Sequence, residues 1–149
     1  MITLRDYWMG RDLKYNGEFT DAIRANGAIT VARANRLLAD YAEDTGVELS
    51  VVSSGWRPKG VNDATANSGR ASRHLTAQAV DLADPTGHFP RWCATHQAHL
   101  AACELWQEDW HWTPVWAHLQ CVAPGSGKIM FIPFDPAVVP PDIPLDVQP

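Results

Sequence analysis

Apolar residues recur at roughly helical spacing over one long stretch of the chain, which predicts a helix. It begins at Thr20 or Asp21, whose side-chain oxygens can accept hydrogen bonds from the free backbone donors of the first turn. It ends at Gly46, because glycine tolerates the left-handed conformation that closes a helix. Gly27 lies inside the stretch and disfavours an unbroken helix. The apolar positions are Ile23, Ile29, Val31, Ala34, Leu38, Tyr41 and Ala42.

Four shorter segments predict β-strands, with turn-forming residues between them. They are residues 47–52, 79–83, 115–121 and 129–132. Residues 58–73 are rich in Gly, Asn, Ser and Ala and predict a long loop, a feature that is usually functional in a compact domain. A second helix is predicted from Phe89 to Cys103. A turn is predicted at residues 124–128, so that strands 115–121 and 129–132 pair as a hairpin.

The chain is long enough for one domain, and its two ends differ from its centre. With 149 residues and 46% hydrophobic content, it can build a single core. Residues 1–20 mix aromatic and charged side chains, and we expect them to pack onto the domain as an N-terminal arm. Six of the last seventeen residues are proline, so residues 134–149 are expected to form an extended tail. The domain is therefore expected to cover residues 1–133.

Charge and composition exclude several classes of protein. A net charge of -5 and a pI near 5.6 do not provide the basic face of a nucleic-acid-binding protein. No apolar run reaches the roughly 18 residues of a membrane span. The first residues lack a basic segment followed by an apolar one, so we expect no secretory signal and synthesis in the cytoplasm. Three cysteines are an odd number for a disulfide scaffold, and we expect free thiols in a monomer.

Two histidines and one aspartate could together hold a metal ion. His74 lies at the end of the long loop, Asp81 on the strand that follows, and His118 on another strand. Two imidazoles and one carboxylate form a ligand set that holds a catalytic zinc and leaves a fourth position for water. Zinc lowers the pKa of such a water and polarises a carbonyl group. The spacing alone also fits a solvent-exposed loop histidine and a hydrogen-bonded strand histidine.

Three segments, taken in order, resemble one family. Ser72-Arg-His-Leu-Thr-Ala-Gln-Ala-Val-Asp81 resembles the S-x-H-x-x-G-x-A-x-D signature of the zinc D-alanyl-D-alanine carboxypeptidases. This superfamily includes VanX- and VanY-like peptidases, phage L-alanyl-D-glutamate endolysins and the hedgehog fold. Ser54-Gly-Trp-Arg-Pro58 resembles the family's S-G-x-R-x segment. Trp116-Ala-His-Leu-Gln120 is similar to the W-x-H-x-Q strand of the phage-type branch. Ordered co-occurrence of three motifs is far more specific than any one of them.

The resemblance implies a fold, an activity and a cofactor. The implied fold is a small α+β domain with an antiparallel sheet, helices packed on one side, and the metal at the open face. The implied activity is hydrolysis of amide bonds in the stem peptides of bacterial peptidoglycan. The enzyme would be a D-Ala-D-Ala carboxypeptidase or an L-Ala-D-Glu endopeptidase. The implied cofactor is one zinc ion per chain, held by His74, Asp81 and His118.

The chain departs from the family pattern at two positions. Ala77 stands where the family has glycine, so the loop differs slightly if that position needs a positive φ. The family's acid-x-x-His arrangement selects Glu108 and His111, whereas the W-x-H motif selects His118. We expect His118 to be the third ligand, because it lies on a predicted strand that leads into the hairpin. His111 is then an accessory group near the cleft.

Further site residues follow from the same resemblance. Glu108 is expected to take a proton from zinc-bound water and pass it to the leaving amine, with Asp109 as the fallback base. Arg57 is expected to pair with a substrate carboxylate or with the developing oxyanion. Ser72 is expected to bond the substrate or a neighbour of a metal ligand, although a cap or turn role fits it as well.

The resemblance also suggests a biological setting. Small size and the phage-type motif favour a phage or prophage lysis enzyme that acts on the cell wall after release. A non-catalytic cell-wall-binding or morphogenetic module on the same fold is the alternative. The choice between a carboxypeptidase and an endopeptidase remains open. The residues that would accept or block a free substrate carboxylate lie in the variable loop 58–71.

Two other clusters have competing interpretations. Cys93, His96, His99 and Cys103 have metal-like spacing on the second predicted helix, but most of them share a face with apolar residues. A core face is therefore favoured over a structural zinc site. Four tryptophans lie within eleven residues, and such a cluster is more often core than the wall of a binding groove. They are Trp106, Trp110, Trp112 and Trp116.

Overall fold

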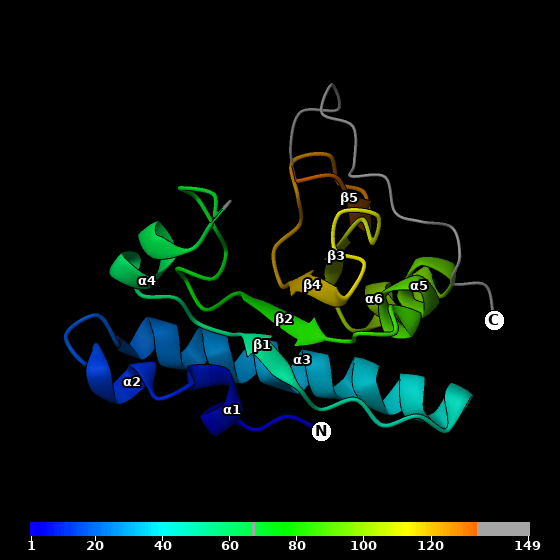
Figure 1. The fold of residues 1–149 in the computed structure, drawn as a ribbon, viewed down its shortest axis with the longest axis horizontal. Helices are drawn as coiled ribbons and strands as arrows, with labels where there is room; N and C mark the ends of the chain where they lie inside the picture. The colour runs from blue at the N-terminus through cyan, green and yellow to red at the C-terminus, as the bar shows by residue number, and fades with distance from the viewer. Residues whose placement is uncertain (67, 134–149) are drawn as a thin grey trace.

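The computed structural model describes residues 1–66 and 68–133; the predicted tail, residues 134–149, lies outside this range. Its elements in chain order form a small α+β domain (Figure 1). The helices are α1 (Leu4–Trp8), α2 (Arg11–Lys14), α3 (Asp21–Thr45), α4 (Lys59–Ala64), α5 (His88–Thr95) and α6 (Gln97–Ala102). The strands are β1 (Val52–Ser54), β2 (Ala79–Ala83), β3 (Trp106–Glu108), β4 (Trp116–Gln120) and β5 (Met130–Phe131).

The five strands form one mixed sheet in the order β1-β2-β4-β3-β5. All neighbours are antiparallel except β3 and β5, which are parallel, so the prediction of a purely antiparallel sheet is wrong. The predicted hairpin is also wrong, because β3 occupies the edge of β4 that a hairpin would have used. Backbone bonds from Gln107 to Ile129 (2.9 Å) and from Asp109 to Phe131 (2.8 Å) attach β5 to β3. A strand as short as β3 gives no readable alternation along the sequence.

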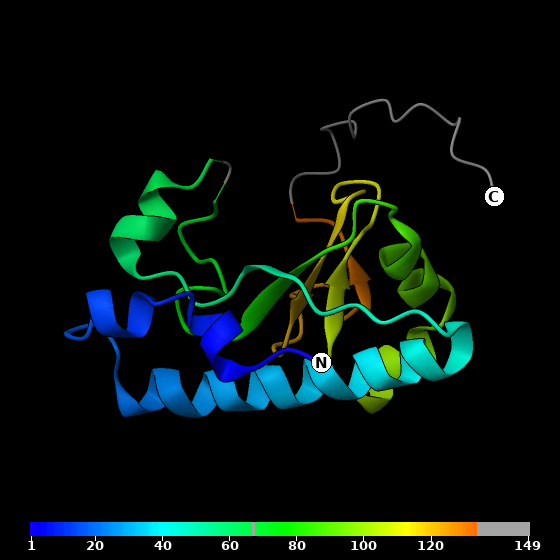
Figure 2. The ribbon, with the colours of Figure 1, turned by 60° about the horizontal axis from the view of Figure 1, so that its bottom comes forward.

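Helix α3 runs along one face of the sheet (Figure 2). Its predicted ends are confirmed: the Thr20 side chain accepts from the Ile23 amide, and Gly46 closes the helix with a φ of 72°. Every second residue of β2 and β4 faces this helix side and is fully buried, including Val80, Leu82 and Leu119. The opposite face carries the polar side chains of Asp81, His118 and Gln120 together with Ala79, Ala83 and Trp116.

The second predicted helix is divided in two at His96. This residue leaves helical geometry (φ -117°, ψ 43°), ends α5 and precedes α6. The Thr95 hydroxyl donates to the Trp92 carbonyl (3.0 Å) and lies 3.0 Å from Nδ1 of the His96 ring, so side chains compete with the helical hydrogen bonds here. The two halves pack on different strands, α5 on β4 and α6 on β3.

The N-terminal arm packs onto the domain. Tyr7 is fully buried, and its hydroxyl donates to the Ala79 carbonyl (2.9 Å) on β2. Trp8 makes edge-to-face contacts with Phe19 and Trp56, at centroid distances of 4.9 and 6.3 Å. The arm therefore covers the segment that carries the S-G-x-R-x motif.

Other local predictions have mixed outcomes. The predicted long loop contains the short helix α4, whereas the turn at residues 124–128 is confirmed by a 2.9 Å bond from Gly127 to Pro124. The four clustered tryptophans are only partly buried, so the core interpretation is wrong for them. The buried tryptophans lie elsewhere, at positions 8, 56 and 92. Among the described residues, no helix is both long and apolar enough to cross a bilayer.

Gly27 allows α3 to remain unbroken while Trp8 packs directly on it. A Cβ at this position would lie 2.0 Å from Cη2 of the Trp8 indole. We expect Gly27→Ala to lower the free energy of unfolding by about 1–3 kcal/mol, because overpacking outweighs the gain in helix propensity. Gly60→Ala in α4 is the control, since nothing lies within 4 Å of its Cβ position. Urea denaturation measures the free energy of unfolding of both variants. An unchanged value for Gly27→Ala would contradict the close packing of Trp8 on α3.

Candidate metal centre

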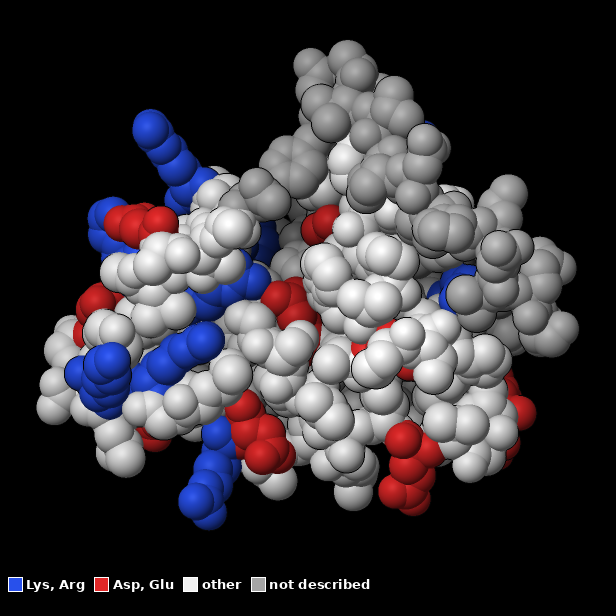
Figure 3. Space-filling model, in the orientation of Figure 1, with Lys and Arg blue, Asp and Glu red and all other residues white. Residues whose placement is uncertain are grey.

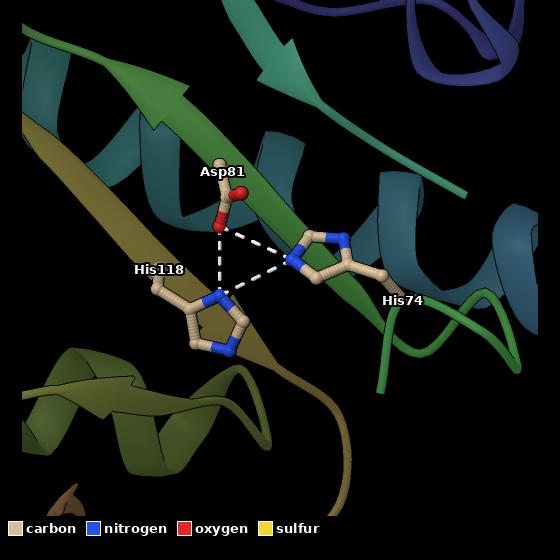
Figure 4. A group of neighbouring side chains, drawn as sticks. All are labelled: His74, Asp81 and His118. Atoms are coloured by element: carbon tan, nitrogen blue, oxygen red, sulfur yellow. Dashed lines mark hydrogen bonds and ion pairs between the residues drawn. The ribbon is translucent and has the colours of Figure 1, made fainter. Parts of the chain in front are cut away.

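Strands β2 and β4 place Asp81 and His118 side by side. The two residues are direct partners in the antiparallel register, so their side chains leave the sheet on the same face. Figure 4 shows both on the side of the sheet away from α3. Continuing the β3–β4 register by one residue places Glu108 opposite His118 on this face. The pairing thus aligns an aspartate, a histidine and a glutamate across three strands.

His74 joins this row from the turn before β2. Its Nδ1 lies 2.7 Å from the Gly55 carbonyl oxygen. A carbonyl oxygen can only accept, so Nδ1 carries the proton and Nε2 has its lone pair free. Nε2 points toward Asp81 and His118 (Figure 4). The backbone of a neighbouring segment therefore fixes both the ring orientation and the tautomer of His74.

Three ligand atoms converge in this group. His74 Nε2 lies 3.2 Å from Asp81 Oδ1 and 3.3 Å from His118 Nδ1, and His118 Nδ1 lies 2.7 Å from Asp81 Oδ1. Ligands about 2.0–2.2 Å from a tetrahedral zinc stand about 3.3–3.6 Å apart, so the 3.3 Å separation already fits, the 3.2 Å separation is just short of this range, and the 2.7 Å separation must widen. The three residues could therefore hold a metal ion.

Arg57 holds the aspartate of this group from behind. Its Nη2 donates to Asp81 Oδ2 (2.9 Å), and its Nε donates to the Ser54 hydroxyl (2.9 Å). The backbone amide of Arg57 also donates to the His74 carbonyl (3.0 Å). Both oxygens of Asp81 are therefore hydrogen-bonded, Oδ1 to His118 Nδ1 and Oδ2 to Arg57. In this structure Arg57 is a residue that orients a ligand.

The charges in the group are strongly coupled. Burial works to raise the pKa of Asp81, but the interactions with the neighbouring His74 and His118 rings hold it well below its usual range. Burial lowers the pKa of His74. The pKa of His118 is raised in spite of burial, because its hydrogen bond to Asp81 and the Asp81 charge favour the protonated ring. A metal ion binding here must displace that proton.

Glu108 lies beside the group without belonging to it. Burial raises the pKa of this carboxyl, the charges of Asp81 and Asp109 add to the rise, and His118 opposes it. A carboxyl with a raised pKa beside a metal centre is suited to both accepting and donating a proton near neutral pH. Its position fits the predicted base, and its role remains a prediction.

Of the two histidines left open by the motifs, the structure brings His118 into the group and leaves His111 outside it. His111 is exposed and stacks on Trp110 at a centroid distance of 3.9 Å. Its Nδ1 lies 2.7 Å from Asp109 Oδ1, so the expected fallback base is already paired with the expected accessory group. The acid-x-x-His arrangement therefore supplies no ligand among the described residues of this group.

Ser72 and Ala77 shape the turn that carries His74. The Ser72 hydroxyl accepts from the His74 amide at 3.3 Å, which is the turn role left open for it. Ala77 has a φ of 56°, so the position does require the left-handed conformation for which the family uses glycine. An alanine there costs on the order of 1 kcal/mol. In this conformation the Ala77 amide donates to the His74 carbonyl (3.2 Å) and closes the turn that carries His74.

The second cluster of cysteines and histidines does not converge. Cys93 and Cys103 are buried in the core, as the helical face predicts. His96 stacks on Trp92 (4.7 Å between centroids), and His99 pairs with Asp40 at 2.9 Å. Within the described part of the chain, only the group around Asp81 brings three possible metal ligands together.

Two groups that support the candidate site are not among the residues predicted from the sequence. The Gly55 carbonyl and the Ser54 hydroxyl both belong to the Ser54–Pro58 segment, in which the motif predicts a role only for Arg57. The motif itself was a signal for both groups, since it begins with Ser54 and Gly55. A backbone carbonyl, however, is present in every residue, so the sequence does not show which one forms a hydrogen bond.

No protein-family model, curated protein or solved structure matches this chain. The site is therefore characterised by its own geometry.

The two histidines give a direct test of the ligand set. We expect the wild-type chain to bind one zinc ion, His118→Ala to lose nearly all of it, and His111→Ala to retain it, because only His118 faces Asp81 and His74. Elemental analysis after zinc reconstitution and desalting measures the stoichiometry. The reverse pattern, with an empty His111→Ala protein, would support the acid-x-x-His arrangement instead.

The bond between Arg57 and Asp81 predicts an effect on metal affinity. Lysine lacks the planar fork that reaches both Ser54 and Asp81, so we expect Arg57→Lys to weaken zinc binding about 10–100-fold. Competition with a chromophoric chelator measures the dissociation constant. Arg24→Lys, at an exposed position of α3, is the matched control. Equal zinc affinities of the Arg57→Lys and wild-type proteins would show that Arg57 does not support metal binding at this site.

Proposed function

We propose that this chain is a zinc-dependent peptidase that hydrolyses amide bonds in peptidoglycan stem peptides. One observation carries the proposal: the Ser72–Asp81 and Trp116–Gln120 segments converge so that His74, Asp81 and His118 present ligand atoms to one point, and the Ser54–Pro58 segment supports them through Arg57. Two imidazole nitrogens and one carboxylate oxygen suit zinc and leave one tetrahedral position open. The similarity of the three segments to the peptidase family supplies the substrate class.

Zinc at this point would polarise the carbonyl of the attacked amide and lower the pKa of a water molecule. The chain's own residues supply the remaining chemistry. Glu108, with its raised pKa and its place across from His118, would accept the proton of the attacking water and donate it to the leaving amine. Asp109 is bound to His111 and is less suited to this task.

Arg57 has a double role in the proposal. Two of its nitrogens hold Asp81 and Ser54, whereas no described residue accepts from its Nη1. That remaining donor would stabilise negative charge that develops on the substrate. His111 lies near Glu108 in the sequence, with its ring exposed, and would contact the substrate as an accessory group. The likeness to the phage-type branch supports a role in lysis of the cell wall.

Release of defined peptide ends from cell walls tests this function. Purified zinc-loaded protein is incubated with sacculi, and the products are identified by mass spectrometry. New free termini within the stem peptides, lost when zinc is removed by a chelator and restored by zinc, would support the proposal. Zinc binding and sacculus binding without any release would favour a non-catalytic wall-binding module.

Glu108→Gln separates proton transfer from metal binding. The amide keeps the shape of the side chain but cannot accept the proton, so we expect turnover to fall about 10²–10⁴-fold while zinc stays bound. Glu43→Gln, at an exposed position of α3, controls for the loss of one carboxylate. Full activity of the Glu108→Gln protein together with an inactive Asp109→Asn protein would transfer the role to Asp109.

A further inference from the structure

Two histidines at the junction of α5 and α6 lie next to one another, on elements that do not carry the candidate metal centre. His96 occupies the break between the two helices, and His99 is the third residue of α6. Their ring centroids are 6.1 Å apart. Two imidazoles bound to one tetrahedral zinc have centroids about 5 Å apart, so a small rotation of the rings brings a nitrogen of each onto one ion. The pair can therefore hold an ion, although the larger cluster with Cys93 and Cys103 does not converge.

Hydrogen bonds select the same tautomer in both rings. His96 Nδ1 lies 2.8 Å from the Trp92 carbonyl oxygen, and His99 Nδ1 lies 2.9 Å from Asp40 Oδ2. Because both oxygens act as acceptors, Nδ1 carries the proton in each neutral ring and Nε2 keeps its lone pair. No described residue bonds either Nε2. Metal-ligating histidines have this arrangement, in which the second ring nitrogen donates to a carbonyl or a carboxylate.

A single indole supports both rings and leaves them accessible. His96 stacks on Trp92 with centroids 4.7 Å apart and an interplanar angle of 15°, and His99 contacts the same indole at 5.3 Å. Trp92 is itself buried and contacts Tyr41 at 5.3 Å. The His99 side chain is nevertheless 38% exposed, and His96 is half-buried. The rings are thus partly ordered before an ion binds, which lowers the entropy that binding must remove.

The neighbouring surface carries the charge that favours a cation. Helix α6 packs on α3, whose last nine residues include Asp40, Glu43 and Asp44 but no Lys or Arg. Figure 3 shows Asp and Glu side chains at the lower right, where α3 ends in Figure 1. A surface region of one sign raises the local concentration of ions of the opposite sign.

We propose that His96 and His99 form a second metal site, which binds a borderline divalent cation such as Zn²⁺ or Ni²⁺ through the two Nε2 atoms. Imidazole nitrogens suit these ions, whereas Mg²⁺ and Ca²⁺ prefer oxygen ligands. Water completes the coordination, so the site binds more weakly than the three-ligand centre and is emptied by desalting. A bound ion connects the end of α5 to α6 across the break at His96. The site is independent of the proposed peptidase function.

Titration of the zinc-loaded full chain with further Zn²⁺ tests the inference. We expect calorimetry to show a second, weaker binding event in the wild-type protein. His96→Gln and His99→Gln should each lose this event and keep the first zinc. His88→Gln is the matched control and should keep both events, because His88 is an exposed histidine of α5 whose Nδ1 lies 2.7 Å from the Tyr41 hydroxyl. Ni²⁺ should reproduce the pattern of the second event, and Mg²⁺ should not bind.

Asp40→Asn tests the support of His99 without removing a ligand. The amide lacks the charge that holds the Nδ1 proton, so we expect the second site to weaken about 10–100-fold. Asp44→Asn, at an exposed position of the same helix, is the control. Nitrogen NMR of the imidazoles gives a direct readout, since the Nε2 resonances of His96 and His99 should shift when Zn²⁺ is added. Circular dichroism and retention of the first zinc establish that each variant is folded.

Three results would overturn the inference. A second event that survives in both His96→Gln and His99→Gln would place the ion on other groups. Equal binding of Mg²⁺ would indicate carboxylate ligands in place of imidazoles. A wild-type protein with no second event up to about 1 mM Zn²⁺ would show that the pair does not bind metal. None of these measurements uses peptidase activity, so a failure of the proposed function is recognised separately, by the absence of cleavage.

Discussion

The Asp81 carboxylate is the interaction on which the rest of the site depends. A charged carboxylate this deeply buried is costly unless each oxygen is bonded and the charge is balanced. His118 donates to Oδ1, and Arg57 donates to Oδ2. The same bonds that make Asp81 tolerable in the interior fix the position of His118, and the Gly55 carbonyl fixes that of His74. The ligand geometry is therefore a consequence of satisfying one buried charge.

The N-terminal arm makes that arrangement rigid. Gly55 passes so close to the arm that a Cβ there would lie 1.9 Å from the Tyr7 carbonyl oxygen. Tyr7 is itself anchored to β2 through its hydroxyl, and Trp56 is enclosed by Trp8 and Phe19. The arm thereby clamps the segment whose carbonyl sets the tautomer of His74 and whose arginine holds Asp81. Aromatic packing at one end of the domain is thus coupled to the geometry of the candidate metal centre.

Sequence patterns were sufficient for the features that depend on local chemistry. Thr20 and Gly46 define the ends of α3, because a cap hydroxyl and a left-handed glycine act within one turn of the helix. The spacing of His74 and Asp81 around a turn and a strand, and the W-x-H motif at His118, identified the three converging side chains. The α+β class also follows from such patterns. The choice of zinc and of a peptidase reaction rests on motif similarity together with this geometry.

The tertiary structure alone decided what depends on pairing between distant segments. It selected His118 over His111, because only the β2–β4 register places a side chain opposite Asp81. It inserted β3 between β4 and β5 and so produced a mixed sheet. A strand of three residues is too short to be predicted from a sequence pattern. The tertiary structure also brought the Arg11 side chain to the carbonyl of Trp56, residues separated by the whole of α3. The sequence determined which chemical groups the chain carries, and long-range packing determined which of them meet, because register and burial are properties of the assembled sheet.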